Sequence, residues 1–199
     1  MNQKLAERLV ALGAKLAPSE GDSLEKFLET VDLSAPLYPK PVDTPWSRAG
    51  ETEPVAGLED YLDSLDGTPS AEELVTYFYA PGHEDRYHGQ SYFSPLKFTP
   101  FLKGSMDYQE WQGIIEEEVA REAIGSIPME LMLIFRSFGY PDCYFLNLED
   151  TDQRDPRIFS TDHEVYFGEI DDCGRFSEFL QGYYTPGELR DALARFLEK

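Results

Sequence analysis

The sequence predicts an α+β fold, with an antiparallel or mixed central sheet and helices packed on it. Amphipathic helices open the chain, strand-like segments follow one another between residues 129 and 170, and helical periodicity returns near the C-terminus. Helices, contiguous strands and helices in this order are typical of α+β proteins. The chain has 199 residues, of which 41% are hydrophobic, so we expect a single domain over residues 1–199 with a substantial core.

The N-terminal helical segment, residues 1–33, is expected to form two short helices. Apolar residues recur at helical spacing over 5–16 and again over 24–31, and the stretch "PSEGDS" separates the two patterns. Residues 34–57 hold five of the 14 prolines and show no periodicity, which predicts a proline-rich connection. The remaining residues, 58–199, form the predicted main body.

Three helices and one irregular strand are predicted before the main run of strands. Residues 58–67 favour a short acidic helix, and the next helix begins after Ser70, which is expected to form a capping box with Glu73. Residues 90–102 have the character of a strand interrupted by two prolines. Residues 107–120 show the apolar spacing of one continuous helix.

Four strands and two C-terminal helices complete the predicted order. The strands are expected at residues 129–138, 142–149, 156–161 and 163–170, and they should supply most of the sheet. The helices are expected at 175–184 and 186–198. The last helix has a clear start signal in "TPGE", which offers an N-cap threonine, a proline in the first turn and a glutamate at N3.

Charge is the most unusual feature of the composition. The chain has 38 acidic and 17 basic residues, a formal net charge of -21 and a sequence pI near 4.3. Such a field repels nucleic-acid phosphates and anionic membranes, and it attracts cationic partners. We therefore expect no direct binding of nucleic acid or membrane. High acidity alone also promotes solubility, so the charge by itself does not identify a partner.

The cysteines and the N-terminus bear on the compartment. Cys143 and Cys173 are the only cysteines and lie outside any C-x-x-C pattern, which indicates two reduced thiols rather than a disulfide or a zinc knuckle. Charged residues interrupt the N-terminal apolar pattern, and no stretch approaches the ~18 apolar residues of a membrane span. We expect a cytoplasmic protein.

Asp162, His163 and Glu164 interrupt a strand-like run and raise the question of a reactive site. A carboxylate beside an imidazole can orient a general base or bind a metal ion. The other histidines, His83 and His88, stand five positions apart, whereas the zincin motif places two histidines four apart on one helical face. We therefore expect no catalytic residue, no metal site and no cofactor. The Asp162 side chain should cap a turn, and His163 should be half buried.

The acidic bend that follows residue 149 invites comparison with a calcium loop. Asp150, Asp152 and Asp155 offer oxygen ligands, but an EF-hand loop starting at Asp150 would have Asp155 in place of the required glycine and Thr161 in place of the bidentate glutamate. These acids are interpreted as turn residues. The sequence also lacks a G-x-S-x-G nucleophile motif and a glycine-rich phosphate loop, so no enzymatic activity is predicted.

The order of elements over residues 127–184 resembles the SUKH superfamily. The segments "YFLNLE", "DPRIFSTDHE" and "FSEFL" occupy matching positions. This superfamily includes a fungal regulator of cell-wall assembly and bacterial immunity proteins that neutralise polymorphic toxins. The resemblance implies an α+β domain without conserved catalytic residues. It gives no expectation for the N-terminal half, which lacks the "LP" and the Asn-Gly-Gly-type turn usual in the family.

Charge and resemblance together predict a non-enzymatic immunity protein that binds a cognate toxin domain stoichiometrically. Residues 142–172 contain ten acids and two arginines. The expected partner is basic, and a nuclease domain is one such toxin. The expected partner-binding residues are Asp150, Asp152, Asp155, Glu164, Asp171 and Asp172. The alternatives are a metal-dependent enzyme that uses His83, His88 and His163, and a regulatory scaffold of the fungal type.

Overall fold

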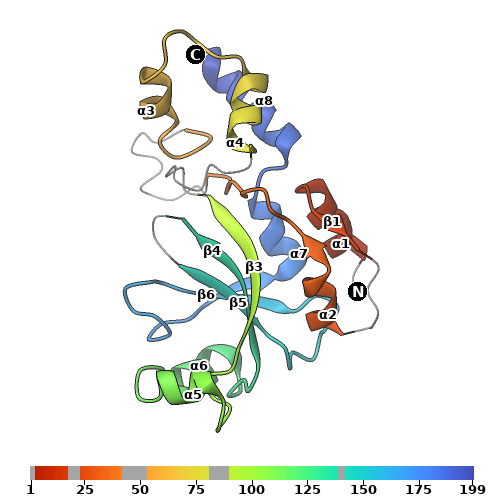
Figure 1. Cartoon of the computed structure of the whole chain (residues 1–199), viewed down its shortest axis with the longest axis vertical. Coiled ribbons are helices and arrows are strands. Elements are labelled where there is room, and N and C mark those ends of the chain that lie inside the picture. The colour runs from red at the N-terminus through yellow and green to blue at the C-terminus, as the bar shows by residue number, and fades with distance from the viewer. Residues whose placement is uncertain (1–2, 18–22, 42–52, 81–89, 139–141) are drawn as a thin grey trace.

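The computed structural model describes residues 3–17, 23–41, 53–80, 90–138 and 142–199 (Figure 1). Its main element is a five-stranded sheet in which each strand pairs antiparallel with the next along the chain, in the order β3-β4-β5-β6-β7. The α+β prediction is confirmed, and the main sheet is antiparallel throughout. Its strands are β3 (Ser91–Phe98), β4 (Leu131–Ser137), β5 (Cys143–Asn147), β6 (Arg157–Thr161) and β7 (Asp171–Arg175).

The edge strand β3 is irregular, as its prolines predict. The register between β3 and β4 shifts between Phe93 and Leu96, at the position of Pro95. Proline has no N–H to donate to a neighbouring strand, so it is tolerated at an edge where the ladder can be interrupted. The hydrogen-bonded strand begins again at Leu96 and pairs with β4 up to Leu131.

The N-terminal helices cover one face of the sheet, together with the short helix α7 (Phe176–Phe179) (Figure 1). α1 (Gln3–Ala11) and α2 (Leu24–Glu29) are shorter than predicted. Their last apolar positions, Leu16 and Val31, instead pair across a small two-stranded sheet of β1 (Lys15–Leu16) and β2 (Val31–Asp32). The buried sheet residues on this face include Met132, Ile134, Leu146 and Ile158.

The opposite face is covered by α5 (Met106–Trp111) and α6 (Glu117–Ile124), at the lower end of Figure 1. The single helix predicted over residues 107–120 is wrong, because Gly113 adopts a φ of 81° and separates two helices. Trp111 closes the first helix and stacks on Tyr166, with ring centroids 4.9 Å apart. The sheet is thus buried on both faces.

The strand predicted at residues 163–170 is also wrong, because this segment forms a series of turns. Tyr166 and Phe167 have φ values of 22° and 61°, which no extended strand allows. The Phe167 ring is fully buried against the second face of the sheet, and its N–H donates to the Thr161 hydroxyl at 2.6 Å. Burial of one aromatic ring and its backbone donor outweighs strand propensity here, and the fifth strand forms at β7 instead.

A third core lies outside the sheet, among α3 (Leu58–Asp63), α4 (Ala71–Phe78) and α8 (Pro186–Leu197) (Figure 1). Both predicted capping boxes are present, at Ser70 with Glu73 and at Thr185 with Glu188. A 3-10 turn, η2 (Leu180–Gly182), leads from α7 towards α8. The buried Tyr38 hydroxyl donates to the Phe78 carbonyl at 2.6 Å and ties the proline-rich connection to this helical unit.

Candidate functional site

The acids of the 150–155 bend mainly build the bend itself. Asp150 accepts the Asp152 N–H at 2.8 Å through one oxygen and the Arg157 N–H at 3.1 Å through the other. Asp152 in turn accepts the Arg154 N–H at 3.2 Å. Short aspartate side chains commonly close turns by such bonds to the backbone two residues on. The interpretation as turn residues is confirmed for Asp150 and Asp152.

Asp155 connects the bend to α7. One carboxylate oxygen accepts the Ser177 N–H at 2.8 Å, and the other accepts the Ser177 hydroxyl at 2.6 Å. Ser177 lies in the first turn of α7, where backbone N–H groups have no partner within the helix. Asp155 therefore caps a helix from a distant part of the chain, and its carboxylate is committed to the fold.

The remaining predicted partner-binding acids lie on the 162–170 turns and on the edge strand β7. Asp172 forms an ion pair with Arg157 and accepts the Gly174 N–H at 2.9 Å. Glu164 and Asp171 are exposed. No described residue donates a hydrogen bond to the Glu164 or Asp171 carboxylate, so both are available to a binding partner.

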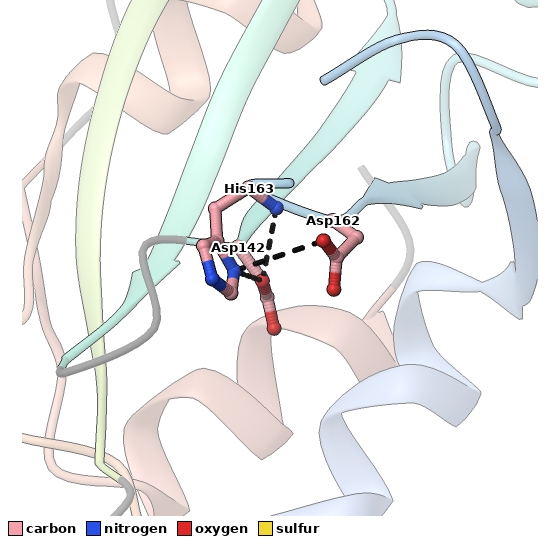
Figure 2. Close-up of side chains that lie close together, drawn as sticks. All are labelled: Asp142, Asp162 and His163. Carbon is pink, nitrogen blue, oxygen red and sulfur yellow. Dashed lines mark hydrogen bonds and ion pairs between the residues drawn. The ribbon is translucent and has the colours of Figure 1, made fainter. Parts of the chain in front are cut away.

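His163 has a partner that its sequence neighbourhood does not reveal. Figure 2 shows the imidazole facing Asp142, which lies just before β5, and its neighbour Asp162. Nδ1 lies 2.8 Å from an Asp142 oxygen and 3.8 Å from an Asp162 oxygen. The pairing of Cys143 with Thr161 across β5 and β6 places Asp142 beside this corner. The register between strands, which is not visible in the sequence, brings the three side chains together.

The corner has the turn chemistry that was expected of it. Asp162 accepts the Glu164 N–H at 2.6 Å, and the His163 side chain is 27% exposed. The hydrogen bond with Asp142 raises the pKa of His163 above its usual value against the opposing effect of burial, and the negative charges of Asp162, Asp142 and Glu164 add smaller rises. These carboxylates favour the imidazolium form.

The two cysteines offer no activated thiolate. Cys143 and Cys173 are free and partly buried. Burial raises the pKa of each thiol, and the nearby carboxylate of Asp142 raises that of Cys143 further, against a hydrogen bond with Tyr166 that lowers it. A nucleophilic cysteine needs the opposite environment, in which positive charge or a helix N-terminus stabilises the thiolate.

A shallow pocket of about 270 Å³ lies between α6 and the acidic bend. It is smaller than the ~300–1,000 Å³ typical of small-molecule sites. Arg157 and Arg175 line it together with Glu149 and Asp150. The pocket is therefore lined by charges of both signs. The exposed acids of residues 162–171, which comprise the turns after β6 and the first residue of β7, do not line it.

The other two histidines, His83 and His88, lie outside the described residues. Within the described ranges, Asp142, Asp162 and His163 form the one group of metal-ligating side chains whose donor atoms cluster, all lying within 4.8 Å of one another. No helix in the same ranges is long and apolar enough to cross a bilayer. Comparison of the chain with protein-family models, curated proteins and solved structures found no match.

Proposed function

We propose that this protein is a non-enzymatic binding protein that neutralises a cognate, basic toxin domain by stoichiometric binding in the cytoplasm. The observation that carries the proposal is the group of exposed carboxylates at one margin of the sheet, on the 162–170 turns and β7. Glu164, Glu169 and Asp171 are exposed, and no hydrogen bond from a described residue reaches their carboxylates. The resemblance to immunity proteins of the SUKH superfamily points to the same class of function.

The position of these carboxylates suits electrostatic attraction of a partner. Glu164 and Glu169 project from turns, and Asp171 begins an edge strand, so a partner can approach them without displacing another element of the described chain. The net charge of -21 adds a field of the same sign over the whole molecule. Complementary charge mainly accelerates association, while a few well-packed contacts determine how slowly the complex dissociates.

The bend has a different part in this proposal. Because the carboxylates of Asp150 and Asp155 already accept backbone N–H groups of Arg157 and Ser177, they help to hold the start of β6 and of α7 in place. Of the six predicted partner-binding residues, Glu164 and Asp171 are the ones we propose to contact the partner first. Asp172 contributes through its ion pair with Arg157, which places an arginine at the rim of the same surface.

Co-purification with the product of the neighbouring gene tests the proposal. We expect a 1:1 complex by size-exclusion chromatography with light scattering, and loss of the toxin's activity at one equivalent. A toxin that stays active with several equivalents of this protein would contradict stoichiometric neutralisation. Inactivation of many toxin molecules by one molecule of this protein would contradict it as well.

A further inference from the structure

We propose that Asp142, Asp162 and His163 bind one divalent transition-metal ion, of which zinc is the best fit. The sequence predicted no metal site, because His83 and His88 lack the zincin spacing and no second motif completes a site around His163. The structure adds Asp142, which lies just before β5, the strand that pairs with β6. The site is independent of the proposed binding function and requires no catalysis.

The geometry of the three side chains favours a shared ion. One donor atom from each residue lies within 4.8 Å of the other two, and all three side chains face the same point (Figure 2). Ligands about 2.0–2.2 Å from a tetrahedral zinc ion are about 3.3–3.6 Å apart. His163 Nδ1 lies 2.8 Å from an Asp142 oxygen and 3.8 Å from an Asp162 oxygen, on either side of that separation. Small rotations of the carboxylates therefore suffice for binding, without movement of the strands.

The carboxylates are held in place before any ion arrives. The Asp142 oxygen accepts the His163 N–H at 3.3 Å, and Asp162 accepts the Glu164 N–H at 2.6 Å. A carboxylate has about four lone-pair positions, so each keeps capacity for a metal after these bonds. Backbone N–H groups that orient a ligating carboxylate strengthen metal binding.

The donor set selects the class of ion. Two carboxylates and one imidazole suit zinc and similar transition metals, whereas calcium and magnesium prefer all-oxygen sites. The Asp142 and His163 side chains are 32% and 27% exposed, and that of Asp162 is 53% exposed, so water can complete the coordination. The surrounding excess of negative charge, including Glu164, attracts a cation to the corner.

Binding replaces the proton between His163 Nδ1 and Asp142 with the metal ion. The histidine then ligates through a lone pair on Nδ1, and the displaced proton passes to solvent. Because Asp142 immediately precedes β5 while Asp162 and His163 follow β6, the ion cross-links two strand ends. We therefore expect the metal to raise the unfolding temperature of the protein, by an amount that grows with the free metal concentration.

Titration of chelator-treated protein with zinc chloride in a calorimeter tests the site. The wild type should bind one equivalent, whereas Asp142→Asn and His163→Gln should each weaken binding by at least about tenfold, the loss typical when a metal site is disturbed. Glu169→Gln, which removes a carboxylate from the same series of turns outside the cluster, is the matched control and should bind like the wild type. Circular dichroism without metal should show that all variants are folded.

Two further measurements separate this site from other sources of metal binding. Magnesium at the same concentration should bind at least about tenfold more weakly than zinc, because the imidazole ligand favours a transition metal. An acidic surface without a histidine ligand would not show this preference. Cys143→Ser should leave zinc affinity unchanged, since the neighbouring thiol is not part of the proposed set. Equal losses in Glu169→Gln and Asp142→Asn, loss on Cys143→Ser, or absence of one-equivalent binding in the wild type would overturn the proposal.

Discussion

The 150–155 bend and the 162–171 segment are both acidic, yet their carboxylates differ in what they do. In the bend, Asp150 and Asp155 each accept two hydrogen bonds, and three of these four come from backbone N–H groups. In the 162–171 segment, Glu164, Glu169 and Asp171 are exposed and receive no hydrogen bond from the described residues. A local excess of acid in a sequence therefore combines carboxylates that build the fold with carboxylates that remain available for binding.

The largest expected effect lies in the bend, at Asp155. Asp155→Ala removes two bonds to Ser177 and leaves an α7 N–H without its partner, so we expect a loss of about 2–3 kcal/mol in the free energy of unfolding. Urea denaturation measures it. Glu164→Gln, with an exposed carboxylate, should change stability by no more than about 0.5 kcal/mol. Equal effects of the two substitutions would remove the distinction between the regions.

The second effect concerns partner binding and should show the opposite pattern. The triple change Glu164→Gln, Glu169→Gln, Asp171→Asn should slow association with a basic partner by about fivefold or more at low salt, because it removes three available charges. Stability should hardly change. Asp150→Asn, measured at a temperature where it stays folded, should slow association less. A triple variant that associates at the wild-type rate would show that these acids do not steer the partner.

The third effect concerns Glu188, whose carboxylate accepts hydrogen bonds within the fold, as those of Asp150 and Asp155 do. Burial alone would raise the pKa of Glu188, but hydrogen bonds from the Thr185 N–H, from Lys40 and from the Thr185 hydroxyl, with the charge of Arg8, lower it to about 2. A pKa below the unfolded value gives stability that is present above pH ~4.5 and is lost as the pH falls towards 2.

Comparison of Glu188→Gln with the wild type across pH checks this expectation. Because the Glu188 side chain is 43% exposed, the difference near neutral pH should be only about 0.5–1 kcal/mol. It should shrink between pH 4.5 and pH 2, where the wild-type carboxylate takes up its proton. A difference that stays constant over this range would show that Glu188 carries no folded-state pKa shift.

The smallest expected effect is that of His163→Ala on partner binding. In metal-free buffer, this change removes the contact with Asp142 but leaves Glu164 and Asp171 in place, so the complex should still form at close to the wild-type rate. Surface plasmon resonance against the toxin domain measures it. Abolition of binding by His163→Ala, with the fold intact, would move the interface from the exposed acids to the Asp142 corner.

The sequence predicted correctly those features that depend only on residues close to one another in the chain. The capping boxes at Ser70 and Thr185 depend on residues three positions apart and were predicted correctly. The predicted strand at residues 163–170 failed because the Phe167 ring is buried in a core built by distant residues. The prediction of one helix over residues 107–120 failed for a local reason, because Gly113 takes a left-handed conformation and ends the first helix.

The candidate site could be predicted only in part. The turn role of Asp162 and the position of the 150–155 bend followed from residue type and spacing. The roles of Asp155 and Asp142 did not, because each depends on a partner about twenty residues away, brought close by strand pairing. Hydrophobic patterning indicates where strands occur, but it does not fix which residues of two strands stand opposite each other.

Association kinetics with the neighbouring gene's product, measured from low to high salt, test the central claim most directly. We expect a 1:1 complex whose association slows steeply as added salt screens charges more than roughly 8–10 Å apart. This salt dependence should flatten in the Glu164→Gln, Glu169→Gln, Asp171→Asn variant. An association rate that is insensitive both to salt and to this neutralisation would contradict electrostatic capture by the exposed acids of the 162–171 segment.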